Sequence, residues 1–129
     1  MNFTSQICTT EEQSKRLLAL GLKRETADCV MMYYDGWHVG EAEHFDFDKD
    51  PVEPAWSLAR LLEMLPSFID IGGFAYMLRI IQGKLFSYCS DIAGHALLYG
   101  KGSVYESAIY TIEWLIKEGH FNKEYLKEK

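Results

Sequence analysis

Apolar residues recur every three or four positions near the end of the chain, the spacing that gathers side chains on one face of an α-helix. In this stretch, residues 103–119, Ser103 and Glu106 form a capping-box pattern, and Gly119 follows the last apolar residue. The pattern predicts a helix over residues 103–119 that buries one face. This helix is the best-marked element of the sequence.

Two further stretches have helical spacing and recognisable ends. Thr10 and Gln13 form a second capping-box pattern, and Gly21 follows the leucines of this stretch, which predicts a helix over residues 11–20. Pro54 suits the first position of a helix, where its missing N–H has no partner, and Pro66 stops the helix that follows. We therefore expect three α-helices.

The remaining apolar runs are short and indicate strands. Asp35-Gly36 separates two such runs, residues 29–34 and 37–45, and this dipeptide is typical of a tight hairpin turn. After residue 67, four β-rich runs follow one another with only two to five turn residues between them. Parallel strands would need longer crossovers, so the runs predict an antiparallel meander.

The fold class that follows is α+β, an antiparallel meander or hairpin sheet packed by three α-helices. At 129 residues, the chain fits a single domain over residues 1–129. We expect the charged residues 122–129 to fray as a tail.

Composition narrows the setting and the partners. Cys8, Cys29 and Cys89 are odd in number and form no C-x-x-C pair, which argues against disulfides and favours a cytoplasmic protein. No run of about 18 apolar residues is present, so no membrane partner is expected. The net charge of −6 argues against nucleic acid. Aromatic residues make up 14% of the chain, and aromatics often anchor protein partners.

The acidic segment at residues 41–53 is the sharpest candidate for chemistry. The segment contains six carboxylates and one basic residue, Lys49. It therefore carries five of the chain's six net negative charges. The potential metal ligands in it are Glu41, Glu43, His44, Asp46 and Asp48. His38 is no partner for His44, because in extended chain the two stand about 20 Å apart. A calcium loop fails too, since Pro51 stands where its glycine belongs. A solvated acidic loop is the alternative, and no cofactor is predicted.

Other catalytic patterns are missing or incomplete. The chain has no Gly-x-Ser-x-Gly motif, and nothing in the sequence orients His95 for nucleophilic catalysis. The glycine-flanked Lys101 lies between a strand and a helix, but the full phosphate-loop spacing is absent and Glu106 would repel an anion. The sequence therefore favours a protein that is not an enzyme.

Several aromatic residues fall at positions that should face solvent. Adjacent Tyr33 and Tyr34 point to opposite faces of the predicted hairpin, and Tyr110 lies on the polar side of the last helix. We select Tyr34, Trp37 and Tyr110 as candidate partner-binding residues. The alternative is that these rings pack half-buried at the edges of the sheet and helix.

Three stretches carry a further signal: QSKRLLALGLKRETAD at residues 13–28, PAWSLARLLEMLPS at 54–67 and YESAIYTIEWLIKEGHF at 105–121. Together they resemble a family of small uncharacterised proteins from prophages and other mobile elements of gut Bacteroidetes-type bacteria. The resemblance implies a mobile-element origin and an intracellular setting. The family has no assigned activity, so the resemblance implies no catalytic residue.

The sequence leads to one functional hypothesis and two alternatives. The first is a non-enzymatic phage or mobile-element accessory protein that acts through protein–protein contacts. The second is a small metal-assisted enzyme or ligand-binding domain that uses the acidic segment, and the third is an acidic decoy for basic proteins. Pairing of two copies through an exposed strand edge is also left open.

Overall fold

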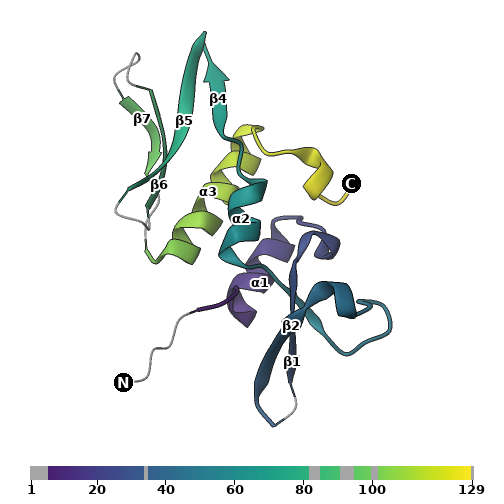
Figure 1. Cartoon of the computed structure of the whole chain (residues 1–129). Helices are drawn as coiled ribbons and strands as arrows, with labels where there is room; N and C mark the ends of the chain where they lie inside the picture. Colours follow the sequence, from purple (N-terminus) through teal and green to yellow (C-terminus); the bar gives the residue numbers. More distant parts are fainter. Residues whose placement is uncertain (1–5, 34, 82–84, 91–94, 100–101, 129) are drawn as a thin grey trace, which may run out of the picture. The chain divides into compact units, whose positions relative to one another are not determined.

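The structure is a computed structural model that describes residues 6–33, 35–81, 85–90, 95–99 and 102–128 (Figure 1). Its contacts divide the chain into two compact units: unit 1, with residues 1–61 and 124–129, and unit 2, with residues 62–123. Across the described residues there are three α-helices and two antiparallel sheets. The predicted α+β class is therefore confirmed.

The sheet of unit 1 has three antiparallel strands in the order β2-β1-β3. They are β1 (Cys29–Tyr33), β2 (Trp37–Glu41) and β3 (Glu53–Ala55). The predicted β1–β2 hairpin is confirmed, with Cys29 opposite Glu41 and Tyr33 opposite Trp37. Asp35 and Gly36 have φ angles of 50° and 109°, a left-handed backbone that asparagine, aspartate and glycine tolerate best.

The first helix, α1 (Glu11–Ala19), begins where the sequence predicted. Gln13 N donates to Thr10 Oγ1 at 3.1 Å, and Thr10 N donates to Gln13 Oε1 at 3.0 Å, so both halves of the capping box are present. Two short 3₁₀ helices, η1 (Arg24–Thr26) and η2 (Ala42–His44), follow in unit 1.

The prediction that Pro54 begins the second helix is wrong. Pro54 lies in β3 opposite Val30, and α2 (Leu58–Met64) begins four residues later. Ser57 precedes this helix, and its Oγ accepts a hydrogen bond from Arg60 N at 3.2 Å. β3 is an edge strand, where proline is tolerated because its missing N–H can face away from the sheet.

Trp56 lies at the centre of unit 1 with no exposed surface. Its indole Nε1 donates to Thr26 Oγ1 at 2.9 Å, and its backbone N donates to Thr9 Oγ1 at 3.0 Å. Thr9 N in turn donates to the Trp56 carbonyl at 2.8 Å. A single buried residue thus connects the N-terminal segment, η1 and the end of β3.

The prediction that residues 122–129 fray is wrong for their described part. Residues 123–125 form a 3₁₀ helix, η3 (Lys123–Tyr125). In unit 1, Lys23 N donates to the Tyr125 carbonyl at 2.9 Å and Lys127 N donates to the Gly21 carbonyl at 2.7 Å. Leu22, which is fully buried, forms a bridge with Leu126. These backbone bonds and the β-bridge hold a segment whose charges suggested a tail.

Unit 2 contains the predicted meander. Its strands β4 (Phe68–Ile71), β5 (Phe74–Ile81), β6 (Leu85–Ser90) and β7 (His95–Tyr99) form one antiparallel sheet in chain order. The predicted turn at 91–94 lies outside the described residues. Tyr88 on β6 is fully buried, donates its hydroxyl to the Pro66 carbonyl at 2.7 Å and stacks on Trp114.

The last helix, α3 (Val104–Glu118), packs against β6 in unit 2 (Figure 1). Glu106 N donates to Ser103 Oγ at 3.2 Å, and Gly119 ends the helix with a φ of 80°, as predicted. The expected burial of one face is confirmed; its buried residues are Tyr105, Ser107, Ala108, Ile109, Thr111, Ile112 and Leu115. No helix among the described residues is long and apolar enough to cross a membrane.

We predict that Thr26→Val destabilises the protein by about 1–3 kcal/mol, because it leaves the buried Trp56 N–H without an acceptor. Thr26→Ser keeps the hydroxyl and should retain most of the stability. Urea denaturation followed by tryptophan fluorescence measures both. Equal stability of the two variants would contradict the role assigned to the Thr26–Trp56 bond.

Candidate functional site

The two faces of the β1–β2 hairpin differ in what covers them. Side chains alternate along each strand, so one face carries Met31, Tyr33, Trp37 and Val39; we call it the hairpin face. Tyr33 is 69% exposed, Trp37 49% and Val39 46%. Three large apolar side chains on one face of one hairpin are therefore in water.

The opposite face is closed by the loop that follows β2. A methyl group at Gly40 would come within 3.0 Å of the Phe45 ring and 3.3 Å of Met32 Cε. Val30, on the same face, has no exposed surface. Phe45 therefore lies against the hairpin and covers part of this side, and glycine at position 40 permits the close approach.

A groove of about 360 Å³ runs beside the exposed residues of the hairpin face. Met31 and Cys8 line it and are each only 6% exposed, while Trp37 and Val39 stand at its side. The N-terminal segment supplies its remaining residues, Ile7, Thr9, Thr10 and Glu11. Ile7 is 69% exposed, so the apolar surface of the hairpin face continues onto this segment.

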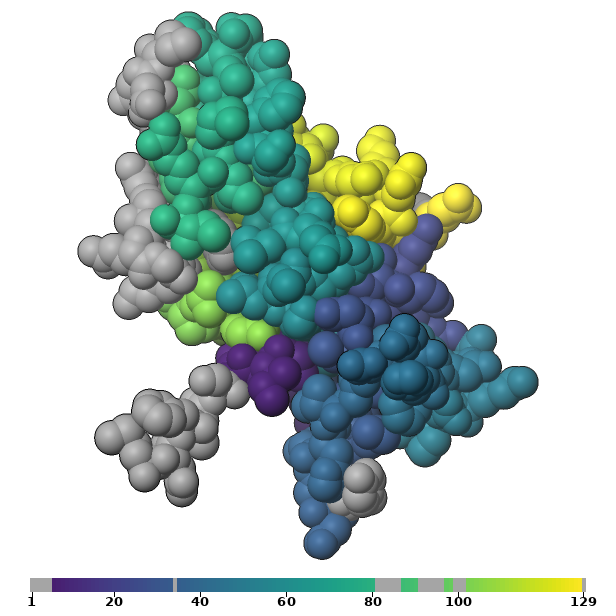
Figure 2. All heavy atoms as spheres, in the orientation of Figure 1, coloured from purple at the N-terminus to yellow at the C-terminus, as the bar shows by residue number. Residues whose placement is uncertain are grey.

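Tyr33 and Trp37 form an aromatic pair at the outer end of the hairpin face. Their ring centroids lie 5.3 Å apart at an interplanar angle of 69°, an edge-to-face arrangement that fixes both rings against one another. The hairpin extends beyond the rest of unit 1 in the space-filling view (Figure 2). The pair is thus presented on a projecting element.

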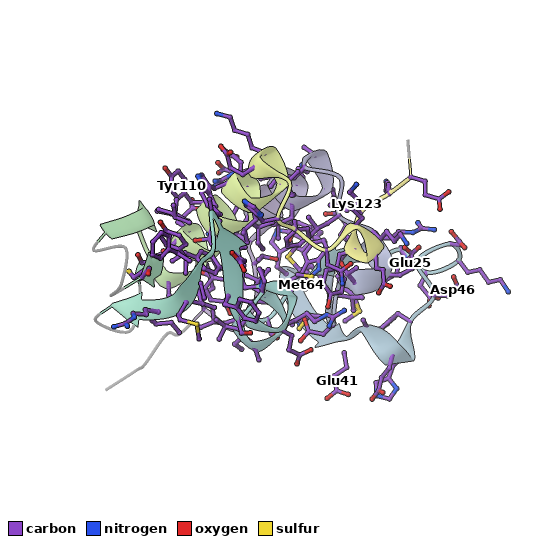
Figure 3. All side chains as sticks on the ribbon, turned by 90° about the horizontal axis from the view of Figure 1, so that it is seen from above. Glu25, Glu41, Asp46, Met64, Tyr110 and Lys123 are labelled. Atoms are coloured by element: carbon purple, nitrogen blue, oxygen red, sulfur yellow. The ribbon has the colours of Figure 1, made fainter. Side chains whose placement is uncertain are left out.

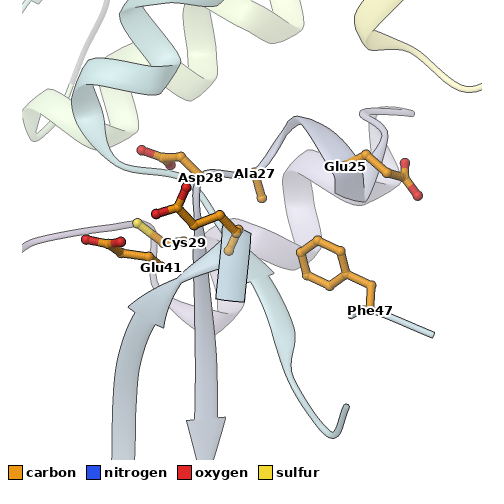
Figure 4. A pocket seen from close by; sticks show the side chains of 8 residues that line it. Glu25, Ala27, Asp28, Cys29, Glu41 and Phe47 are labelled. Atoms are coloured by element: carbon orange, nitrogen blue, oxygen red, sulfur yellow. The ribbon is translucent and has the colours of Figure 1, made fainter. Parts of the chain in front are cut away.

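A second pocket, of about 730 Å³, lies at the base of the hairpin (Figure 4). Four carboxylate residues line it: Glu25, Asp28, Glu41 and Glu43. Its other lining residues are Ala27, Cys29, Ala42 and Phe47. Asp28 already accepts hydrogen bonds from Ser57, from the backbone N at 2.8 Å and from the hydroxyl. The pocket combines negative charge with an apolar wall, a composition suited to a Lys or Arg side chain.

The two cysteines near these pockets are held in the thiol form. Burial raises the pKa of Cys29 to about 12, and the charge of Asp28 adds to the effect. Burial, followed by the charge of Asp28, also raises the pKa of Cys8. Because the thiolate is the reactive form, neither cysteine is suited to nucleophilic catalysis at neutral pH.

Of the five predicted metal ligands, the structure brings together Glu41, Glu43 and His44. One ligand atom from each lies within 4.8 Å of the others, and all three residues are exposed. His44 Nε2 is 3.4 Å from Glu41 Oε2 and 3.6 Å from Glu43 Oε1. The same distances suit ion pairing of a protonated histidine with two surface carboxylates.

The other two predicted ligands, Asp46 and Asp48, belong to a separate turn. Asp48 N donates to Asp46 Oδ1 at 2.8 Å, and Asp46 N donates to Asp50 Oδ2 at 2.7 Å. The Asp48 carboxylate forms an ion pair with Arg24. Glu41 and Asp46 accordingly lie apart (Figure 3). The acidic segment therefore does not converge on one centre.

The three predicted partner-binding residues fall in different places. Trp37 is exposed on the hairpin face, as expected. Tyr110 is half-buried on α3 and belongs to unit 2. Tyr34 lies outside the described residues. Sequence reasoning missed Ile7 and Val39, although the two-residue alternation along β2 would have placed Val39 on the same face as Trp37.

Unit 2 also has exposed apolar residues on β4 and β5 that the sequence did not single out: Phe68, Ile71, Phe74, Met77 and Ile80. Phe68 on β4 lies directly opposite Met77 on β5, and the two side chains are 52% and 46% exposed. Single exposed apolar residues are common on proteins. Phe68 provides a matched comparison for the exposed aromatic residues of the hairpin face.

Comparisons with known proteins give no relative: no family model, no curated protein and no solved structure matches the chain. The resemblance to mobile-element proteins stays a prediction.

We predict that alkylation of Cys29 by iodoacetamide at pH 9 is at least about tenfold slower in the native protein than in urea, because the folded chain keeps the thiol protonated. The stability that this thiol contributes should be present below pH 9 and decline between pH 9 and about 12. Mass spectrometry of labelled peptides gives the rate. Equal labelling in the native and unfolded states would contradict the raised pKa.

Proposed function

We propose that this chain is a non-enzymatic accessory protein of a phage or mobile element that acts by binding another protein, and that the hairpin face is its binding surface. The observation that supports this most is the exposure of Tyr33, Trp37 and Val39 beside an apolar groove. Ile7 extends the same surface. Apolar surface that is contiguous and exposed favours association with a partner.

The residue types also favour a binding surface. Burying apolar area is the dominant favourable term in most protein association, so large rings contribute most. Tryptophan and tyrosine are enriched among the residues that dominate binding energy. Tyr33 and Trp37 hold one another in place, which lowers the conformational entropy that binding would cost. The phage or mobile-element origin in this proposal rests on the sequence resemblance alone.

A divalent cation site is the second candidate function, and the approach of Glu41, Glu43 and His44 favours it. Against it, all three ligands are exposed and His44 can pair with both carboxylates without a metal. Calorimetry with calcium, magnesium, manganese and zinc separates the two functions. Heat with one cation that disappears in His44→Ala would favour the metal site, and no heat would remove it.

The acidic-decoy alternative has less support from the geometry. Asp46, Asp48 and Asp50 are joined by hydrogen bonds within one turn, and Arg24 pairs with Asp48. Their charges are thus partly engaged within the chain. A decoy would capture basic proteins through residues 46–53 and release them at about 0.5 M salt, where charges are strongly screened.

We predict that Trp37→Ala weakens binding of the partner by about thirtyfold, the effect of losing a central aromatic contact of about 2 kcal/mol. Because Trp37 is half exposed, the substitution should change the protein's free energy of unfolding little. Proteins captured by the wild type, Trp37→Ala and Phe68→Ala can be compared by quantitative mass spectrometry.

The matched control is Phe68→Ala, which removes a similarly exposed aromatic from unit 2. It should leave the captured proteins unchanged. The proposal fails if Trp37→Ala captures the same proteins in the same amounts as the wild type.

A further inference from the structure

The outer edge of β2 is an open strand edge among the described residues. β2 is the outermost strand of its sheet, with β1 on its other side. In an antiparallel pair, residues alternate between those that bond across the pair and those whose N–H and C=O face away. Two observations show which residues of β2 face the open edge.

The first observation is a hydrogen bond at the base of the hairpin. Ala42 N donates to the Asp28 carbonyl at 3.0 Å, one step beyond the opposed residues Cys29 and Glu41. Bonded and non-bonded pairs alternate along an antiparallel ladder. The bond between Ala42 and Asp28 therefore makes Cys29 and Glu41 a non-bonded pair, and Val30 and Gly40 the next bonded pair. The backbone groups of the intervening β2 residues, Glu41, Val39 and Trp37, then face outward.

The second observation is Pro54, which lies opposite Val30 on the other side of β1. Proline has no N–H, so its position is tolerated where the strand pair does not bond. Val30 therefore directs its own N–H and C=O toward β2. Pro54 and the Ala42 bond thus indicate independently that Val30 and Gly40 bond across the β1–β2 pair.

The residues with outward backbone groups are also those whose side chains point to the hairpin face. Trp37 and Val39 line the apolar groove, and Glu41 lines the acidic pocket. Along the edge of β2, alternate side chains are therefore apolar at Trp37 and Val39 and acidic at Glu41. A strand added beside β2 would place its own side chains next to these three in the same order.

We propose that the partner binds as an extended segment, which pairs antiparallel with β2 and places two apolar residues beside Trp37 and Val39 and a Lys or Arg beside Glu41. Adding a strand to a sheet edge is an established mode of peptide recognition, in which main-chain bonds give affinity and alternate side chains give specificity. This inference rests on the proposed function and names the chemistry of the partner.

Charge favours a basic partner over a second copy of the chain. Unit 1 contains 13 acidic and 8 basic residues, a formal charge of −5, against −1 for unit 2 with 6 acidic and 5 basic residues. Two copies paired through β2 would bring two such units together. A Lys or Arg at the position of Glu41 instead meets the carboxylates of the acidic pocket.

The test uses a synthetic peptide, acetyl-Thr-Lys-Thr-Val-Thr-Val-Thr-amide, whose lysine and two valines fall opposite Glu41, Val39 and Trp37. Binding is followed by amide signals of the ¹⁵N-labelled full chain. We expect the largest shifts at these three residues. A peptide with glutamate in place of lysine should bind more weakly at low salt.

Backbone methylation separates strand pairing from simple contact of side chains. Methylating the two valine nitrogens removes the donors that would bond to β2, and binding should weaken by about tenfold or more for the loss of these bonds. Methylating the two central threonine nitrogens instead blocks only the far edge of the peptide. Binding of that control should persist.

The outcomes distinguish this inference from the proposed function. Equal binding of the valine-methylated and threonine-methylated peptides, or no binding of the unmodified peptide at millimolar concentration, overturns strand pairing. Association of the chain with itself through β2, detected as a concentration-dependent mass, overturns it as well. If Trp37→Ala still weakens partner capture in these cases, the hairpin face remains the binding surface.

A substitution in the protein provides a second test of strand pairing. Val39→Pro removes the outward N–H without touching the bonds to β1, whereas Val39→Ala removes only side-chain surface. Strand pairing predicts that Val39→Pro binds the peptide at least about tenfold more weakly than Val39→Ala. Equal affinity of the two variants, with amide spectra that show both folded, would contradict it.

Discussion

The buried Trp56 is the contact on which unit 1 depends. Its indole bonds to Thr26 and its backbone to Thr9, so segments far apart in sequence meet at one fully buried residue. β3 ends directly before Trp56, and β3 pairs with β1. The base of the hairpin is thereby fixed to the core of unit 1, while its outer end needs no further support from the chain.

The exposed surface follows from an imbalance between the two faces of that hairpin. Phe45, from the loop after β2, covers part of one face, where Gly40 leaves room for the ring. On the other face, Cys8 packs against Met31 near the base, but Tyr33, Trp37 and Val39 remain in water. Polar residues at these three positions would change the free energy of unfolding little, because exposed side chains meet water in both the folded and the unfolded state. Their apolar character is explained if another protein covers them.

Local signals predicted much of the fold. The Thr10–Gln13 cap, the Ser103 cap and the Asp35-Gly36 turn each specify a backbone geometry within a few residues, so sequence alone located α1, α3 and the hairpin. Pro54 shows the limit of such reasoning. Proline suits both the first turn of a helix and an edge strand, and the choice depends on pairing with Val30, 24 residues away.

The candidate site was predicted only in part for the same reason. Trp37 was selected only as one of several aromatic residues that could anchor a partner, without an argument for its own position. The exposure of Tyr33 and Val39 depends on which face of the hairpin Phe45 covers, and the alternation along β1 and β2 does not specify to which face the loop after β2 returns. The acidic segment was prominent in sequence, but hydrogen bonds within its turn and the ion pair to Arg24 separate Asp46 and Asp48 from Glu41.

Amide hydrogen exchange along β2 tests the central claim most directly, because it reads the open edge without a ligand. From the register and the bond of Ala42 to Asp28, we infer that the amides of His38 and Gly40 bond to β1, whereas those of Trp37, Val39 and Glu41 face outward. The alternation predicts slow exchange at residues 38 and 40 and fast exchange at 37, 39 and 41. Equal protection of all five amides would contradict an open, exposed edge beside the hairpin face.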